Sequence, residues 1–146
     1  MNLLENKKAY LSYEILDTIT AGIVLTGAEV KSLRNNHGSI NDAFVIFEHG
    51  VPVLAKVFIP PYQIKNTPGN YDPYHHRKLL MNKSEIANFF RKKSEAGLTL
   101  VPLKMYTENR KIKVLLGLAR GKSKHDKRET IKKRDADREI NRLLKN

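Results

Sequence analysis

Two long alternating apolar runs near the end of the sequence constrain its fold more than any other feature. They form the stretch LTLVPLKMYTENRKIKVLLGLARG, residues 98–121, and they meet at the polar residues Glu108 and Asn109. Alternation with a period of two is typical of strands buried on one side, and a short polar break between two such runs favours a hairpin. In the second run the core side is Ile112, Val114, Leu116 and Leu118, and the other side is Lys111, Lys113, Leu115 and Gly117. The sequence therefore predicts an antiparallel hairpin with a partly basic outer face.

Three further main strands are predicted upstream. Residues 13–26 are rich in β-branched and aromatic residues and are interrupted by Ala21 and Gly22, which is the pattern of a long bent strand. The stretch AFVIFEHGVPVLAKVFI, residues 43–59, has two apolar runs around His49 and Gly50 and predicts a second hairpin. Together with the two strands of the hairpin at 98–121, these make five main strands. A brief sixth strand, KLLM, is predicted at 78–81. The order predicts a mainly β fold with short helices, an OB-like antiparallel barrel, and leaves an open α+β sheet as the alternative.

Two helices and one long loop are expected between the strands. The stretch AEVKSLRNNHG predicts a short helix that ends near Gly38. NKSEIANFFRKKSEAG predicts a longer helix, because Asn82 and Glu85 have the spacing of a capping box. The apolar stripe of this longer helix is Ile86, Phe89 and Phe90. Residues 60–76 contain five prolines and glycines, so they predict a loop, and loops of this length in compact domains are commonly functional or mobile.

The charge balance points to a polyanionic partner. The chain carries 27 Lys and Arg against 15 Asp and Glu, a net charge of +12. A surplus of this size opposes compaction and is typical of proteins that bind nucleic acid, although a basic surface kept for solubility is the alternative. The sequence has no cysteine, no secretory signal and no apolar run long enough to cross a membrane. We therefore expect one cytoplasmic domain with an extension.

The last 28 residues differ in composition from the rest. Residues 119–146 contain eleven Lys or Arg and five acidic residues, and their thin apolar stripe is Ile131, Ala136, Ile140, Leu143 and Leu144. A helix with so little to bury is marginal in water. We therefore divide the chain into an OB-like RNA-binding barrel, residues 1–118, and a basic C-terminal tail, residues 119–146, that is disordered in the free protein and becomes helical on a partner. The alternative is a helix docked on its own barrel.

Residues suited to catalysis are few. His75 and His76 are adjacent, which directs them to opposite sides of an extended chain, and no carboxylate lies at metal-ligand spacing from them. Glu29 and Asp42 could serve as the carboxylate pair of a nuclease, although helix-start and turn positions explain both. The glycines are scattered, without a phosphate-binding pattern. We expect a protein with no catalytic residues, no bound metal and no cofactor.

Cations and tyrosines recur where nucleic acid could reach them. Pairs of basic residues lie near the ends of predicted elements: Lys7 and Lys8, Lys31 and Arg34, Arg77 and Lys78, and Lys111 and Lys113. Rings that could stack on bases are supplied by Tyr10, Tyr13, Tyr62, Tyr71 and Tyr74. Each feature is weak by itself, but together with the net charge they favour RNA or DNA binding.

Three stretches of the sequence closely resemble one protein family. They are GIVLTGAEVKSLR at 22–34, GLTLVPLKMY at 97–106 and VLLGLARGKSKHDKRE at 114–129. NKKA at 6–9, the dipeptide DP at 72–73 and RKLL at 77–80 fall in the matching order around them. The family is that of the SsrA-binding proteins, SmpB, the bacterial partners of transfer-messenger RNA, and the resemblance covers nearly the whole chain from Asn6 onward.

The resemblance implies an OB-like barrel that performs no bond chemistry. The family binds the tRNA-like end of transfer-messenger RNA and delivers it to ribosomes stalled on messages without a stop codon. The implied partners are this RNA, in a complex of one monomer per RNA, and the ribosome, at its small-subunit decoding region and mRNA channel, where the tail becomes helical. A general OB-type RNA chaperone or ribosome-associated RNA-binding protein is the alternative function, and a nuclease using Glu29 and Asp42 is a third hypothesis.

The resemblance and the basic pairs together assign two sets of site residues. The RNA-binding set is Asn6, Lys7, Lys8, Glu29, Lys31, Arg34, Arg77 and Lys78. The ribosome-binding set in the tail is Gly121, a hinge, His125, a ring that stacks on a ribosomal base, and Asp126, Lys127, Arg128, Lys132, Lys133 and Arg134. Glu29 either accepts hydrogen bonds from bases or ribose hydroxyls or caps the helix that follows it. The sequence differs from the family pattern at two places. Ser12 stands where an acidic residue is common, and NYDPYHHRK, residues 70–78, has tyrosine and histidine in place of arginines.

Overall fold

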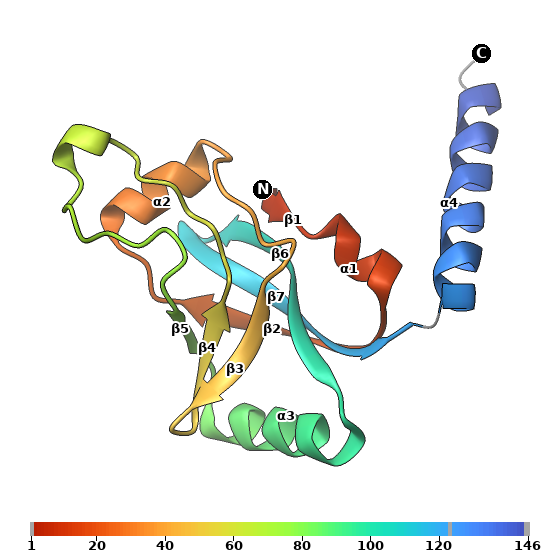
Figure 1. Cartoon of the computed structure of the whole chain (residues 1–146), viewed down its shortest axis with the longest axis horizontal. Helices are drawn as coiled ribbons and strands as arrows, with labels where there is room; N and C mark the ends of the chain where they lie inside the picture. The colour runs from red at the N-terminus through yellow and green to blue at the C-terminus, as the bar shows by residue number, and fades with distance from the viewer. Residues whose placement is uncertain (1, 123, 145–146) are drawn as a thin grey trace.

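The computed structural model describes residues 2–122 and 124–144, and an antiparallel sheet organises them (Figure 1). The seven strands in this part of the chain are β1 (Asn2–Glu5), β2 (Tyr13–Ile23), β3 (Phe44–Glu48), β4 (Val51–Ala55), β5 (Arg77–Leu80), β6 (Thr99–Glu108) and β7 (Lys111–Gly121). Their order across the sheet is β1-β6-β7-β2-β5-β4-β3. The helices are α1 (Lys7–Ser12), α2 (Gly27–Arg34), α3 (Lys83–Ala96) and α4 (Lys124–Leu144), with a 3-10 turn, η1 (Ile64–Asn66). None of the described helices is long and apolar enough to span a bilayer.

The hairpin predicted at the end of the sequence is confirmed and lies near the middle of the sheet. β6 and β7 pair along nearly their whole length, and β2 pairs with the other side of β7. Asn109 and Arg110 make the turn with left-handed φ values of 50° and 64°. Gly117 allows close packing in this layer, because a Cβ there would lie 3.1 Å from Leu103 Cδ1 and 3.2 Å from Ile15 Cγ2. The predicted hairpin at β3 and β4 is also confirmed.

The sheet curls but does not close into a complete barrel (Figure 1). β3 and β6 lie close together, yet no ladder joins them in the described residues, so β1 and β3 remain the edges of the sheet. The mainly β fold with short helices is confirmed, and the barrel is only a loose description of it. β1 and α1 were not predicted, because with four and six residues they are too short to show a periodic pattern.

Side chains from every strand meet in one hydrophobic core, and helices lie over it. Phe89 of α3 and Leu33 of α2 are both buried in this core, and the two helices lie at opposite ends of the sheet in Figure 1. The four predicted core residues of β7 are buried, as expected: Ile112, Val114, Leu116 and Leu118. A smaller cluster consists of Ala9, Val101, Leu103 and Ala119. This second cluster holds α1 against β6 and β7.

Capping boxes begin both α2 and α3. Thr26 and Glu29 form the first. Asn82 and Glu85 form the second, which is the box that the sequence predicted. In each box the side chain of the first residue accepts a hydrogen bond from the backbone N–H of the glutamate, and the glutamate side chain accepts one from the backbone N–H of the first residue. α3 is capped at its C-terminal end by Gly97, whose φ of 63° lies in the left-handed region that glycine adopts without strain.

The apolar stripe predicted for α3 is only partly buried. Phe89 is 4% exposed, whereas Phe90 is 50% exposed. Neighbouring residues of an α-helix point roughly 100° apart, so both rings cannot face the core. Phe90 instead lies edge-on to Phe47 of β3, with the ring centroids 5.1 Å apart.

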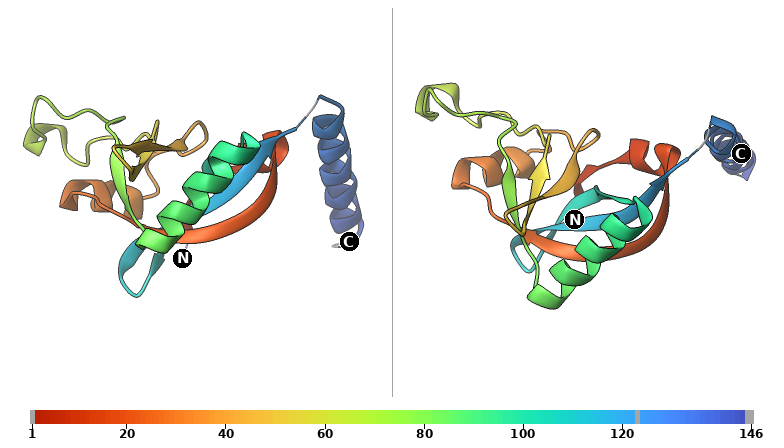
Figure 2. Two further views of the ribbon diagram at one scale, coloured as in Figure 1. Left: turned by 90° about the horizontal axis from the view of Figure 1, so that it is seen from below. Right: turned by 60° about the horizontal axis from the view of Figure 1, so that its bottom comes forward.

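α4 projects away from the body of the protein (Figures 1 and 2) and comes near the body at α1. β7 continues through Gly121, beyond the boundary predicted after residue 118, and α4 begins at Lys124. Every described side chain of α4 is exposed, so the alternative of a helix docked on the barrel does not describe this structure. A helix whose described side chains are exposed gains little stability from tertiary packing. We therefore continue to expect disorder of the tail in the free protein, with this helix as its ordered form.

Candidate nucleic-acid interface

A buried ion pair lies between α2 and β5. Glu29 and Arg77 expose only 2% and 1% of their surfaces. Glu29 Oε2 accepts hydrogen bonds from Arg77 Nε at 2.9 Å and from Arg77 Nη2 at 2.6 Å. Arg77 Nη1 donates to the carbonyl oxygen of Val57 at 2.6 Å. The pair therefore ties α2 to the first residue of β5 and to the chain that leaves β4.

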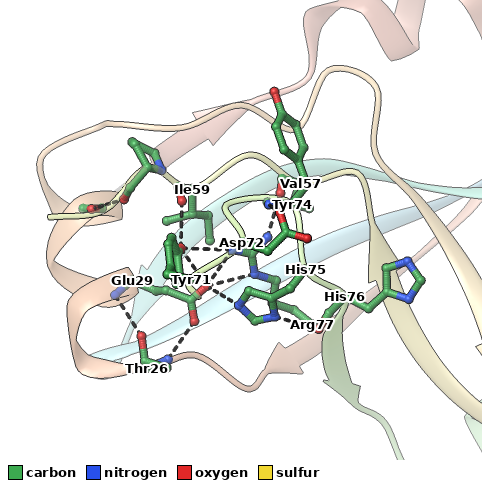
Figure 3. A network of polar contacts seen from close by, with 12 residues as sticks. Thr26, Glu29, Val57, Ile59, Tyr71, Asp72, Tyr74, His75, His76 and Arg77 are labelled. Atoms are coloured by element: carbon green, nitrogen blue, oxygen red, sulfur yellow. Dashed lines mark hydrogen bonds and ion pairs between the residues drawn. The ribbon is translucent and has the colours of Figure 1, made fainter. Parts of the chain in front are cut away.

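Two residues of the loop at 60–76 complete the network around Glu29 (Figure 3). The Tyr71 hydroxyl donates to the carbonyl oxygen of Ile59 at 2.7 Å and lies 3.3 Å from Glu29 Oε2. His75 Nε2 lies 3.0 Å from the same carboxylate oxygen, and His75 Nδ1 lies 3.1 Å from the carbonyl oxygen of His76. The network fastens the end of the loop to α2.

The network also sets the acidity of two of its members. Burial raises the pKa of the Glu29 carboxyl group, but the N–H of Thr26, the hydrogen bonds and charge of Arg77 and the charge of His75 outweigh it, so the pKa lies below the ordinary value of 4.5. Burial and the negative charge of Glu29 raise the pKa of Tyr71 above its ordinary value of 10.0. At neutral pH Glu29 is therefore a carboxylate and Tyr71 a neutral hydroxyl.

We expect the Glu29 carboxylate to stabilise the fold in a pH-dependent way. Because its pKa is lower in the folded than in the unfolded chain, its contribution is complete above pH 4.5 and is lost as the pH falls through the lowered folded value. Urea unfolding of the wild type and of Glu29→Gln should differ strongly at neutral pH and converge in acid. Glu85→Gln, in the exposed capping box of α3, is the matched control. A gap between wild type and Glu29→Gln that persists unchanged far into the acid range would contradict this account.

Glu29 has the capping role that was one of its two expected functions. Its Oε1 accepts a hydrogen bond from the N–H of Thr26 at 2.9 Å, and its Oε2 is shared by Arg77, His75 and Tyr71. Both oxygens are therefore engaged inside the protein.

Asn6, the first predicted RNA-binding residue, is also 2% exposed. Its Oδ1 accepts from the N–H of Ala9 at 3.1 Å and caps α1. Its Nδ2 donates to the carbonyl oxygens of Ile40 at 3.1 Å and Pro102 at 2.8 Å. Asn6 thus joins α1 to β6 and to the segment that precedes β3. Like Glu29 and Arg77, it is a buried residue that holds neighbouring elements in place.

The other predicted RNA-binding residues are exposed cations on three elements. They are Lys7 and Lys8 on α1, Lys31 and Arg34 on α2, and Lys78 on β5. α1 and α2 lie on the same side of the sheet, away from α3 (Figure 1). We call the four cations of α1 and α2 the helix surface. The predicted pair at residues 77 and 78 is divided by strand alternation, since Arg77 is buried and Lys78 is exposed.

A second basic surface covers the outer side of β2, β6 and β7. Tyr106 of β6 lies opposite Lys113 of β7, and its hydroxyl is 3.2 Å from Thr20 Oγ1 of β2. Lys104 Nζ lies 5.2 Å from the centre of the Tyr106 ring. Beside these residues a groove contains Leu80, which is 59% exposed, together with Lys111 and Lys113. We call Leu80, Lys104, Lys111 and Lys113 the sheet surface.

Only two of the four residues of the sheet surface could be predicted from the sequence. Alternation in β7 predicted that Lys111 and Lys113 face outward, and the structure confirms it. Lys104 and Leu80 join them because β6 and β5 are placed on either side of β7 and β2. No local pattern in the sequence encodes this pairing.

Comparison with known proteins establishes the family. The family model described as SmpB protein matches residues 3–146. The chain belongs to the SmpB family. The SsrA-binding protein of Bartonella henselae is 51% identical over 98% of this chain and 90% of its own length, and that of Enterococcus hirae is 45% identical over 99% and 93%. A solved chain, from a structure described as "tmRNA-SmpB: a journey to the center of the bacterial ribosome", is 45% identical and superposes with a TM-score of 0.69 over 90% of this chain and 95% of its own.

The SmpB family match includes the tail. Arg128, Lys132, Lys133 and Arg134 belong to α4 and are exposed. The side chains of His125, Asp126 and Lys127 lie outside the described residues, so the contacts expected of them stay predictions.

The root of the tail is held by the body. Gly121 ends β7 opposite Tyr13 of β2, and a Cβ at Gly121 would meet no atom within 4 Å. The next residue, Lys122, donates its N–H to the carbonyl oxygen of Ser12 at 2.9 Å. Packing does not demand a glycine at 121, so its expected role as a hinge concerns the backbone freedom of this position.

The two carboxylates considered for a nuclease have separate partners. Glu29 is buried against Arg77, whereas Asp42 is exposed and lies 3.3 Å from Lys8 Nζ. Among the described residues, no group of three or more His, Asp or Glu side chains is arranged to hold a metal ion. Nothing in the geometry of this SmpB family member favours the nuclease hypothesis.

Proposed function

We propose that this chain is a non-enzymatic RNA-binding adaptor for ribosome rescue. It binds the tRNA-like part of transfer-messenger RNA and delivers this RNA to stalled ribosomes, where its tail probes the empty mRNA channel. The observation that carries the proposal is the family match over residues 3–146, which spans body and tail together. The similarity to a chain from a tmRNA-SmpB structure of the bacterial ribosome supports the same partners. The protein acts in the cytoplasm as a monomer, one copy per RNA.

The two parts of the chain have separate tasks in this proposal. The body, which the structure extends through Gly121, holds the RNA, and the tail that follows contacts the ribosome. Divided at the boundary predicted from the sequence, residues 119–146 have 11 basic and 5 acidic residues, a net +6, and residues 1–118 have the remaining 16 and 10, also +6. Both parts therefore attract a polyanion, and the binding of each to RNA should weaken with salt.

We assign the RNA contacts of the body to the helix surface, the sheet surface and Lys78. Cations at these positions neutralise phosphates whatever the base sequence, so a folded RNA is recognised by its shape. Asn6, Glu29 and Arg77 act as positioning residues, because their buried side chains hold α1, α2 and the loop in place.

In the tail, we assign phosphate contacts in the channel to Lys132, Lys133 and Arg134. Asp126, Lys127 and Arg128 contact the decoding region, His125 stacks on a ribosomal base, and Gly121 is the hinge. The exposed positions of Arg128, Lys132, Lys133 and Arg134 support this assignment, since an exposed cation is free to meet a phosphate.

The RNA assignment is tested by salt titration of binding to a tRNA-like RNA. Lys31→Ala on the helix surface and Lys113→Ala on the sheet surface should each weaken binding and reduce the slope of log K against log salt by about one phosphate-equivalent. Arg91→Ala, in the second half of α3, removes one positive charge outside both surfaces and should leave the slope unchanged. An unstructured RNA of equal length should bind the wild type more weakly. Equal slopes for all three variants would refute the assignment.

A further inference from the structure

Two aromatic rings, the half-buried Phe58 and the exposed Tyr74, form a shelf beside the helix surface. The rings of Phe58 and Tyr74 have centroids 5.1 Å apart and planes inclined by 37°. Tyr74 is 55% exposed, and its ring points away from the Glu29 network in Figure 3. A hollow lies against the two rings, and Asp42 and Lys56 are among the residues that line it. We call Phe58 and Tyr74 the aromatic shelf.

The backbone beneath the shelf is tied down on both sides. Phe58 exchanges two backbone hydrogen bonds with Ser39, at 2.9 and 3.0 Å. The N–H of Tyr74 donates to Asp72 Oδ1 at 2.9 Å. The next residue, His75, is held by Glu29. The backbone that carries both rings is therefore fixed, and a ligand that stacks on them orders little of the protein.

Charged groups surround the shelf in an arrangement that suits a nucleotide. Lys56 is exposed at the rim of the hollow. Asp42 lies on the same rim and is 3.3 Å from Lys8 Nζ of the helix surface. Two ammonium groups thus stand where they can meet phosphates, and one carboxylate can accept a hydrogen bond from the amino group of a base. An aromatic face with cations beside it is the usual platform for unpaired bases.

We propose that the aromatic shelf stacks one unpaired base of the bound RNA, with Lys56 and Lys8 on the flanking phosphates. A base inside a duplex is covered on both faces by its neighbours, so only a base turned out of a helix can reach the rings. The inference rests on the proposed RNA-binding function and adds the class of nucleotide that the body recognises. The helix and sheet surfaces supply charge, and the shelf supplies preference for an unpaired base.

The test uses two RNA hairpins of equal length, one with a single bulged 2-aminopurine and one with the same base paired. The full-length wild type should bind the bulged hairpin about tenfold more tightly and should quench its fluorescence by stacking. Tyr74→Ala should abolish both the preference and the quenching, whereas Tyr74→Phe should retain them. The affinity for the paired hairpin should be the same in all variants, because the cations are untouched.

Phe90→Ala is the matched control. Phe90 is 50% exposed and forms a second aromatic pair with the same 5.1 Å separation, on α3. This variant should retain the preference for the bulged hairpin. A wild type that binds both hairpins equally and without quenching, or a Tyr74→Ala variant that keeps the preference, would overturn the shelf while leaving the proposed function intact. Failure of the wild type to bind either hairpin would also overturn the shelf, whereas the proposed function is refuted only by failure to bind the tRNA-like RNA.

Discussion

Replacement of Arg77 by methionine is expected to lower the free energy of unfolding by about 3–5 kcal/mol, the usual effect of removing one partner of a buried ion pair. Arg77 is 1% exposed and makes two hydrogen bonds to Glu29 Oε2 and a third to the carbonyl of Val57. Methionine fills part of the space but leaves the Glu29 carboxylate buried beside a neutral side chain. The expected result is a large shift in the midpoint of urea or thermal unfolding.

The neighbouring residue provides the control for this experiment. Lys78 lies next to Arg77 in the same strand but is exposed, so Lys78→Met should change the stability by no more than about 0.5 kcal/mol. The paired replacement Glu29→Met with Arg77→Met removes both charges and should cost much less than the sum of the two single variants. Additive effects in this double-mutant cycle would show that the two residues do not act as a pair.

Arg77→Met should also weaken RNA binding, although Arg77 itself makes no contact with RNA in this proposal. The Glu29 network fastens the loop at 60–76 to α2, so its loss releases the loop that carries Tyr74 and disturbs Lys31 and Arg34 on α2. Lys31→Ala, in contrast, removes a charge and leaves the fold intact. A positioning residue and a phosphate contact are thus distinguished by stability and salt slope measured on the same proteins.

Features with a local pattern could be predicted from this sequence. The hairpin at Asn109 follows from alternation on both sides of a polar turn, and the start of α3 follows from Asn82 and Glu85 three residues apart. β1 and α1 could not be predicted, because their few residues become ordered through contacts with β6. One of these contacts is the hydrogen bond from Asn6 to the carbonyl oxygen of Pro102. Whether the curled sheet closes is decided by how β3 approaches β6, and no residue pattern records that distance.

In the candidate site, too, residues with a local pattern could be predicted and residues joined only by the fold could not. The exposed cations were predicted as pairs, and Lys7, Lys8, Lys31 and Arg34 are exposed as a binding surface requires. The sequence could not show that Glu29 meets Arg77, because they are 48 positions apart and each by itself reads as an ordinary charged residue. A buried glutamate is recognised only when its partner is placed beside it by the fold.

Removal of the residues after Lys122 is expected to leave RNA binding by the body nearly unchanged and to abolish rescue of stalled ribosomes. β7 ends at Gly121 and the Lys122 N–H is bonded to Ser12, so the body keeps all its strands and the anchor of the tail. The described side chains of α4 are exposed, so their loss exposes no core. The measurements are the affinity for the tRNA-like RNA and the tagging of nascent chains on ribosomes stalled without a stop codon.

Two single substitutions test whether the tail must be helical to act. Ala136 is exposed in α4, and Ala136→Pro breaks the helix at a cost of about 3 kcal/mol while the charge of the tail stays the same. Ala136→Gln keeps the helix and is the matched control. If the channel binds the tail in its helical form, the proline variant should lose rescue and the glutamine variant should retain it, with equal RNA binding by both. Rescue by the proline variant, or by the protein without its tail, would show that charge alone or the body alone performs the task, because neither protein retains the intact helix.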